Sequence, residues 1–281
     1  LIFVAVFTLL GWGLSRIKQP SAGLLTGAIV FLLALLVVLK TPALATAASG
    51  LLRSAVGQSA ERAAALDVRW LGFSYIAFRL IHTLRDRQNG RLPAVSLQEY
   101  LVYALFFPAF TAGPIDRLER FLQDLRRPLE PAAGDILQGG QRLAVGLFKK
   151  FALADSLALI ALNGTNALQT GSTGWMWVLL YAYSFQIYFD FSGYTDIAIG
   201  LGRLLGVKLP ENFNHPYLKP NLTQFWNNWH ITLTQWFRAY YFNPLTRGLR
   251  RSGKNLPPWA VILVTQVSTM LLIGLWHGVT W

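Results

Sequence analysis

Long apolar runs separated by short polar segments dominate the hydropathy pattern of this chain. A stretch of about 20 apolar residues is needed to cross roughly 30 Å of hydrocarbon. Leu1–Leu14 reads as part of one span, and Ala22–Leu39 reads as a complete span that is closed by Lys40. Trp259–Trp276 reads as the last span. The pattern therefore predicts an all-α, polytopic membrane protein.

Two further apolar segments do not read as simple spans. Trp70–Leu84 carries Arg79 and His82, so we expect it to be shielded by protein or to lie near an interface. Tyr100–Thr111 runs into Gly113–Pro114, which stops a helix and leaves backbone groups that need partners inside the protein. A re-entrant or bent segment fits this second stretch better than a crossing helix.

The charge pattern predicts the topology of the middle of the chain. Ile115–Arg142 is polar with both charges, and Leu143–Leu162 reads as amphipathic or membrane-spanning. Asn163–Gly174 contains no charged residue, and Trp175–Leu205 is a long apolar run interrupted by acidic and small residues. Because basic segments flank the uncharged loop, the positive-inside rule places the loop on the outer face and the flanking segments in the cytoplasm. The flanking basic residues are Lys149, Lys150, Arg203 and Lys208.

Composition agrees with a membrane class. The chain is 53% hydrophobic and 14% charged, with a mean hydropathy of +0.39. The Lys and Arg residues behind its net charge of +12 lie between apolar stretches, where binding to lipid headgroups explains them better than binding to nucleic acid does. With 0 Cys, a disulfide framework, a thiol nucleophile and a thiolate metal site are excluded. Both ends lie in apolar runs, so we expect residues 1–281 to be a single membrane domain truncated at both ends.

Thr223–Tyr241 is expected to form an amphipathic aromatic helix that lies in an interface or lines a cavity. Spacings of three and four put five side chains on one face of such a helix. The alternative is that its Trp residues only anchor the helix at the membrane surface. The five side chains are Trp226, His230, Leu233, Phe237 and Tyr240.

Two histidines on separate apolar elements are candidate functional residues. His277 follows the last apolar run, with Gly274 and Gly278 close by, so a substrate or other backbone would be able to approach its ring. A histidine at membrane depth is costly unless it is hydrogen-bonded or functional. An imidazole with a pKa near 6.5 is the usual side chain for moving a proton at neutral pH, so the presence of His230 as well favours function.

Asp190 and Asp196 interrupt an apolar run and lie about one and a half helical turns apart. They would share a face only if Gly193 kinked the helix. Two interpretations stay open for them, namely ion pairs with Arg or Lys and positions in the wall of a polar pocket.

Other enzyme classes lack their motifs here. There is no G-x-S-x-G nucleophile elbow and no H-E-x-x-H or close histidine pair, which argues against a serine hydrolase and a zinc site. Gly200, Gly202 and Gly206 do not have the spacing of a dinucleotide-binding loop, so close helix packing is the better interpretation.

Four motifs, taken together and in this order, resemble the membrane-bound O-acyltransferase family, in particular the branch of alginate O-acetylases and teichoic-acid D-alanyl transferases. They are TAGPID at Thr111–Asp116, FDFSGYTDIAIGLG at Phe189–Gly202, PENFNHPY at Pro210–Tyr217 with the following FWNNWHITLTQWFRAYYFNPL, and LWHG at Leu275–Gly278. The DIAIG form at Asp196–Gly200 is more similar to the alginate branch.

The resemblance implies re-entrant and amphipathic helices around a tunnel, where a cytoplasmic acyl thioester and a hydroxyl from the far side meet. It implies that His277 is the catalytic base and that His230 orients or polarises a reactant. Asn228 and Trp229 would shape the tunnel wall, and the other candidates for it are Trp226, Asp190, Asp196 and Trp276. No bound cofactor or metal is implied, because the donor is a substrate carried by coenzyme A or an acyl carrier protein.

We therefore expect a multi-pass protein of the bacterial plasma (inner) membrane that transfers an acyl group, in first place acetyl, to a hydroxyl of a cell-surface or exported polysaccharide. Its partners would be membrane lipids, the donor's carrier, and a glycan or a periplasmic acyltransferase. The alternatives are D-alanyl transfer to teichoic acid, a transporter or export subunit, and a scaffold for a separate transferase. Two departures from the family bear on substrate preference: Asn227 and Asn228 stand without a base before His230, and Ala239 follows Arg238 where an acidic residue is common.

Overall fold

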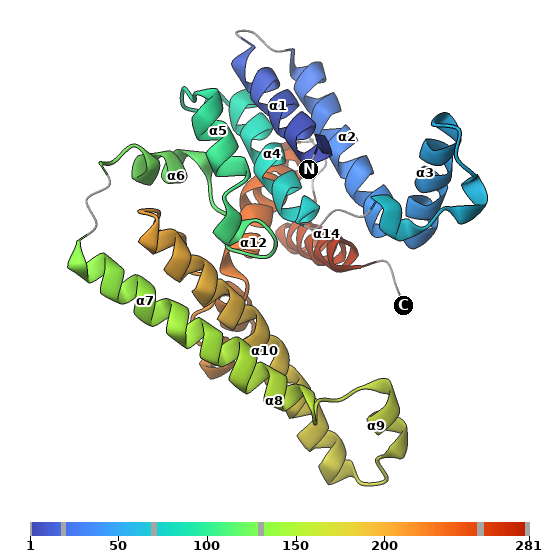
Figure 1. Cartoon of the computed structure of the whole chain (residues 1–281), viewed down its shortest axis with the longest axis vertical. Coiled ribbons are helices and arrows are strands. Elements are labelled where there is room, and N and C mark those ends of the chain that lie inside the picture. Colours follow the sequence, from blue (N-terminus) through green and yellow to red (C-terminus); the bar gives the residue numbers. More distant parts are fainter. Residues whose placement is uncertain (1, 18–20, 69–71, 129–131, 252–255, 279–281) are drawn as a thin grey trace. The chain divides into compact units, whose positions relative to one another are not determined.

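The computed structural model describes residues 2–17, 21–68, 72–128, 132–251 and 256–278, and every regular element in these ranges is helical. The chain divides into two compact units (Figure 1). Unit 1 comprises Leu1–Leu105 with Leu233–Trp281, and unit 2 comprises Phe106–Thr232. The all-α expectation is confirmed for the described residues, whereas the expectation of one membrane domain stays a prediction.

Unit 1 is built around helix α4 (Phe73–Gln88), which is buried along almost all of its first three turns. Three helices pack beside it, as Figure 1 shows. They are α1 (Ile2–Arg16), α2 (Ala22–Lys40) and α5 (Leu97–Ala104). Residues 70 and 71 of the predicted segment Trp70–Leu84 lie outside the described residues.

The charge of Arg79 is shielded by protein. Its guanidinium is 2% exposed and donates hydrogen bonds to the carbonyl oxygens of Tyr103 and Ala104, at 3.1 and 2.9 Å. These carbonyls belong to the last turn of α5, where helical partners are lacking. His82, fully buried, lies 3.1 Å from the hydroxyl of Tyr103. Of the two expectations for this segment, the shielded one is confirmed.

Two of the described helices are long and apolar enough to cross a membrane, judged by length and composition alone. They are α2 and α14 (Pro258–His277), which confirms two predicted spans as helices. Few of their apolar side chains are buried, namely Leu25 and Leu32 in α2 and Val261 in α14. Exposed apolar faces of this length suit a lipid environment.

The segment Tyr100–Thr111 breaks earlier than the sequence predicted. Helix α5 ends at Ala104 and a single 3₁₀ turn follows at Phe107–Ala109, ahead of the Gly-Pro pair. An eight-residue helix is about 12 Å long, too short to cross a bilayer. Gly113 then lies so close that an added Cβ would be 2.4 Å from the Cα of Ala109. The expected bend is present, with its first break at Leu105.

Unit 2 contains a pair of long helices that lie side by side (Figure 1). The first begins as α7 (Ala133–Leu147) and continues without a break through the π-helical segment η4 (Phe148–Ala154) into α8 (Asp155–Ala158). The second is α10 (Thr173–Leu204), which runs straight through the interruption at 190–196 as one helix. The predicted start at Leu143 was wrong by ten residues, because Asp135 and Arg142 find polar partners within unit 2 and so do not end the helix.

Glycines allow these two helices to touch backbone to backbone. A Cβ on Gly146 would lie 2.7 Å from the carbonyl oxygen of Gly193, and one on Gly200 would lie 2.8 Å from that of Gly139. The expected close packing is thus confirmed for Gly200. Gly206 instead has a φ of 81° and forms the turn that ends α10.

The remaining described elements are short. Helix α9 (Gly164–Gln169) starts in the uncharged loop, capped by the Asn163 side chain. The others are α3 (Pro42–Ala55), η1 (Ala60–Arg62), η2 (Ala65–Val68), α6 (Leu118–Leu125), η5 (Pro216–Leu218), α11 (Leu222–Asn228), α12 (Ile231–Phe237), the π-helical η6 (Arg238–Phe242) and α13 (Asn243–Arg251).

The single aromatic helix predicted over Thr223–Tyr241 is wrong. Helix α11 ends at Asn228, Trp229 is extended, and His230 has a left-handed φ of 44° before α12 begins. The chain around Asn212 causes the break, since the Asn212 carbonyl accepts from Ile231 N at 2.9 Å and Asn214 N donates to the Asn228 carbonyl at 3.1 Å. Of the five side chains expected on one face, Trp226 lies in α11 and His230 at the break, whereas Leu233, Phe237 and Tyr240 lie in α12 and η6.

Candidate functional site

His277 ends helix α14 in unit 1, and its side chain is exposed. The preceding Trp276 fixes this end of the helix, because its ring packs 6.2 Å from the ring of Tyr75 and 5.4 Å from that of Phe78. Lys40 Nζ lies 4.8 Å from the centre of the Trp276 ring and donates to the Trp276 carbonyl. A cation at a helix C-terminus stabilises its last carbonyls.

The imidazole of His277 is therefore accessible while its backbone is held. Its ring centre lies 4.6 Å from that of Trp276, at an interplanar angle of 66°. A Cβ placed on Gly274 would meet nothing within 4 Å, so no other described segment packs there.

His230 lies in unit 2 and is 3% exposed. Its Nδ1 is 3.1 Å from Asn212 Oδ1, and its ring meets that of Phe191 edge to face at 4.7 Å. The same Asn212 oxygen accepts from the backbone N–H and the hydroxyl of Thr232, at 3.2 and 2.9 Å. A buried histidine that is hydrogen-bonded and has a left-handed backbone conformation is held in one orientation.

The other candidates from the aromatic segment form a cluster of rings. Trp229 stacks on Phe225 at 5.5 Å and meets Phe213 edge to face at 5.1 Å, and Tyr217 lies 5.9 Å away. Trp226 is 38% exposed, and its ring meets that of Phe225 edge to face at 5.2 Å. The Asn228 amide donates back to the carbonyl of Gln224 in its own helix. None of Trp226, Asn228 and Trp229 lines the pocket described next.

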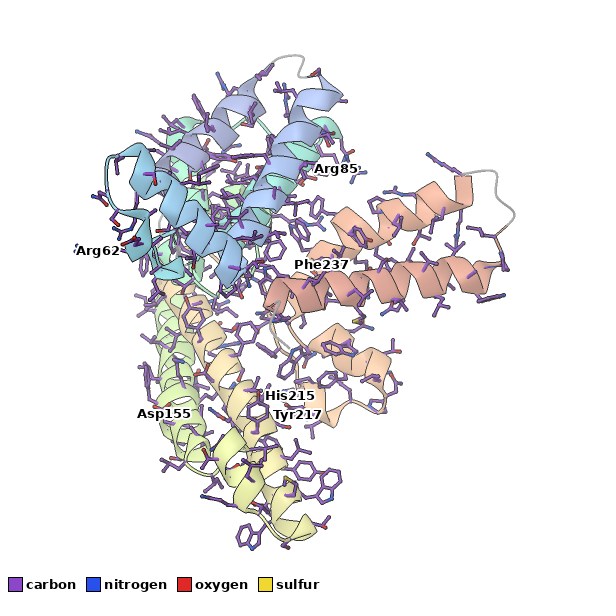
Figure 2. The ribbon with its side chains drawn as sticks, turned by 90° about the vertical axis from the view of Figure 1, so that its right-hand side faces the viewer. Arg62, Arg85, Asp155, His215, Tyr217 and Phe237 are labelled. Atoms are coloured by element: carbon purple, nitrogen blue, oxygen red, sulfur yellow. The ribbon has the colours of Figure 1, made fainter. Side chains whose placement is uncertain are left out.

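Unit 2 also contains a polar pocket of about 790 Å³ between α7, α10 and the segment that follows α10. Figure 2 shows the labelled His215 and Tyr217 beside the α7–α10 pair, and His215 is one of the lining residues. Four cationic side chains line the pocket against two carboxylates. They are Arg142, Lys149, Arg203 and Lys208, with Asp196 and Glu211.

Asp196 is the buried acid of this pocket. It is 4% exposed and accepts from Arg142 Nε at 2.6 Å and from Lys149 Nζ at 2.7 Å. Arg142 also donates to Glu211 at 2.9 Å. Burial disfavours the charged guanidinium, but the two carboxylates raise the pKa of Arg142 above its ordinary value. Both interpretations of Asp196, ion pair and pocket wall, hold together.

Asp190 is different, because it pairs with Lys150 at the surface and does not line the pocket. The two aspartates therefore contact different basic residues, as expected for positions on different faces of a continuous helix. For Asp190 the structure supports the ion-pair interpretation alone.

Sequence reasoning missed Asn212 and the pairing of Asp196 with Arg142. A signal for the second was present, since Arg142 and Lys149 are seven residues apart, two turns of a helix, and a buried acid needs basic partners. For Asn212 no local signal exists, because its partners His230 and Thr232 are 18 and 20 residues away.

Comparison with known proteins places these features in context. The family model described as MBOAT, membrane-bound O-acyltransferase family, matches residues 22–281. The chain is 34% identical over 223 residues to a teichoic acid D-alanyltransferase of Streptococcus thermophilus, covering 76% of this chain and 53% of that protein. It is 39% identical over 209 residues to the probable alginate O-acetylase AlgI of Pseudomonas syringae, covering 74% and 39%. It is 37% identical over 211 residues to a peptidoglycan O-acetyltransferase of Helicobacter pylori, covering 70% and 39%.

The chain thus spans about half or less of the length of these curated relatives. The residues that the family model matches, 22–281, contain all four motifs noted in the sequence.

Proposed function

Since the chain belongs to the membrane-bound O-acyltransferase family, we propose that it transfers an acyl group, in first place acetyl, from a thioester to a hydroxyl of a cell-surface or exported polysaccharide. The observation that carries the proposal is the accessible imidazole of His277 at the fixed end of an apolar helix. The relatives named as alginate O-acetylase and peptidoglycan O-acetyltransferase support an acetyl group and a polysaccharide acceptor.

His277 acts as general base in the proposed reaction. It takes the proton of the acceptor hydroxyl while the hydroxyl oxygen attacks the thioester carbonyl carbon. The carbon–sulfur bond then breaks, and the thiolate leaves with the proton, so that an ester and a free thiol are formed. No covalent enzyme intermediate is needed. General-base assistance of this kind contributes about 10² to 10⁴ in rate, and holding both reactants in a closed tunnel adds to it.

The polar pocket of unit 2 takes the phosphate-bearing part of the donor. Coenzyme A and the phosphopantetheine arm of a carrier protein are both anionic, and cationic side chains outnumber acids around the pocket. The pocket includes Lys149, Arg203 and Lys208, which the positive-inside rule assigns to the cytoplasm. A donor delivered from the cytoplasm of a bacterial plasma (inner) membrane enters on that side.

D-alanyl transfer to teichoic acid is the second candidate, because relatives of this name match at 34% and 31% identity. A periplasmic acyltransferase is a further possible recipient of the acyl group. The chemistry at His277 is the same in each case, and only the acyl group and acceptor differ.

Strains carrying the wild-type gene or His277→Ala test the proposal. We expect the variant to lose ester-linked acyl groups from its surface glycan, by at least about a hundredfold given the contribution of a general base. Mass analysis of base-released groups separates acetate from D-alanine. Gln169→Ala, at an exposed position that does not line the pocket, serves as a matched control for insertion and protein level.

Unchanged acylation in a His277→Ala strain with normal protein level would refute the proposal. Altered movement of a solute in that strain, with acylation intact, would favour the transporter alternative instead. If acylation requires the protein but purified protein never consumes a thioester, the scaffold alternative holds.

A further inference from the structure

Asn212 is fully buried, and one atom of its side-chain amide is the centre of a hydrogen-bond network. This atom, Oδ1, lies 3.2 Å from the backbone nitrogen of Thr232, 2.9 Å from the Thr232 hydroxyl and 3.1 Å from Nδ1 of His230. All four groups belong to unit 2.

The backbone decides which groups donate. A backbone N–H can only donate, so the amide atom facing Thr232 N must be the oxygen of Asn212 and not its nitrogen. The Thr232 hydroxyl accepts from the backbone N–H of Ile115 at 3.0 Å, which leaves its own hydrogen for Asn212. Asn212 Oδ1 is therefore an acceptor, and the His230 Nδ1 that faces it must carry a hydrogen.

A neutral imidazole has a single N–H, so the other ring nitrogen then holds a lone pair. We propose that Asn212 is a positioning residue that keeps neutral His230 in the Nδ1–H tautomer, so that its buried Nε2 acts as a hydrogen-bond acceptor in the reaction. The substrate part of this inference rests on the acyl transfer proposed above.

This assignment decides between two roles for His230. Polarising a thioester carbonyl requires a hydrogen-bond donor, whereas orienting an attacking hydroxyl requires a hydrogen-bond acceptor. With the hydrogen on Nδ1, Nε2 of His230 suits the hydroxyl of the acyl-accepting substrate and does not suit the thioester carbonyl. It thereby takes part on the acceptor side of the reaction, and the carbonyl is polarised by another group.

The same asparagine also fixes the backbone of His230. The carbonyl oxygen of Asn212 accepts from Ile231 N at 2.9 Å, next to the left-handed residue. Phe191 meets the imidazole edge to face at 4.7 Å and limits its rotation. A left-handed conformation at a residue with a side chain persists only where its surroundings determine it, as they do here.

The tautomer can be measured directly, because the sequence contains only 4 His. The complete membrane protein, labelled with ¹⁵N-histidine, gives four pairs of ring-nitrogen signals, and His230→Gln identifies the pair of His230. We expect a protonated Nδ1 and a non-protonated Nε2 above neutral pH. A protonated Nε2 beside a non-protonated Nδ1 in the wild-type protein would overturn the proposal.

Two substitutions test the role of Asn212. Asn212→Asp keeps an oxygen toward all three donors, and it removes no other hydrogen bond because Asn212 Nδ2 has no partner among the described residues. Asn212→Leu removes the acceptor. We expect the leucine variant to shift His230 toward the other tautomer and to lower kcat about tenfold to a hundredfold, as is typical when the partner that orients a functional imidazole is lost.

The aspartate variant should keep the wild-type tautomer and most of the activity, with KM for the thioester unchanged in both variants. Asn166→Leu, in the uncharged loop of the same unit, is the matched control and should behave like wild type in every readout.

An Asn212→Leu variant that folds and keeps the wild-type tautomer and kcat refutes the positioning role. A wild-type protein that shows the Nδ1–H form but never transfers an acyl group refutes the proposed function and the substrate contact, and leaves the tautomer assignment standing.

Discussion

Lys40 contacts Trp276, the residue before His277, and so holds the end of helix α14 that carries His277. It lies at the end of α2, yet it donates to the carbonyl of Trp276 and lies over the Trp276 ring in α14. One side chain thus ties two candidate membrane helices together within unit 1, next to the proposed base. A displacement of about 1 Å at a reacting group can cost about 10² in rate.

We therefore predict that Lys40→Met lowers kcat of acyl transfer about tenfold or more, with the protein still inserted. The methionine fills the space of the lysine stem but supplies no donor and no charge. Lys40→Arg, which keeps both, should retain more activity than the methionine variant. Steady-state kinetics of purified variants measure the difference, and equal kcat values for the three proteins would contradict the assigned role.

At the scale of elements, the contact between α7 and α10 depends on glycine. Backbone atoms of the two helices meet at Gly146 and Gly193, where even a methyl group has no room. This packing holds Arg142 of α7 and Lys149 of η4, which continues α7, against Asp196 of α10. These three side chains line the pocket of unit 2.

We predict that Gly146→Ala destabilises the protein by about 1 to 3 kcal/mol, the usual cost of overpacking. Gly140→Ala is the matched control, because it lies on the same helix and its Cβ would meet nothing within 4 Å. The control should be neutral or stabilised, since alanine is a better helix former than glycine. Thermal unfolding followed in detergent measures both, and equal midpoints for the two variants would contradict the backbone contact.

At the scale of the whole molecule, the charge pattern predicts which loops face the cytoplasm. The chain has 0 Cys, so single introduced cysteines can be labelled without a background. Gly171 in the uncharged loop and Leu205 after α10 are both exposed. The positive-inside rule places them on opposite sides of the membrane.

We predict that a membrane-impermeant maleimide labels Gly171→Cys in intact cells and labels Leu205→Cys only after permeabilisation. The reason is that Arg203 and Lys208 lie near the second position and no charged residue lies near the first. Labelling of both positions in intact cells would contradict this orientation, and with it the cytoplasmic entry of the donor.

The sequence by itself determined the class of the protein and the ends of the long helices α2, α10 and α14 to within about two residues. Apolar runs of membrane length predicted α2 and α14 because the hydrocarbon core imposes their length on any crossing helix. The family follows from four motifs whose order is a property of the chain alone. His277 was found in this way, since its position at the end of an apolar run is local information.

Only the tertiary structure decided the surroundings of His230 and Asp196. Helical periodicity predicted one helix through His230, but hydrogen bonds from the chain around Asn212 break it there. A carboxylate in an apolar run indicates a partner without naming it, and the partners Arg142 and Lys149 lie 54 and 47 residues away in the chain. Local patterns report the preferences of neighbouring residues, whereas buried polar groups are satisfied by whatever the fold brings within about 3 Å.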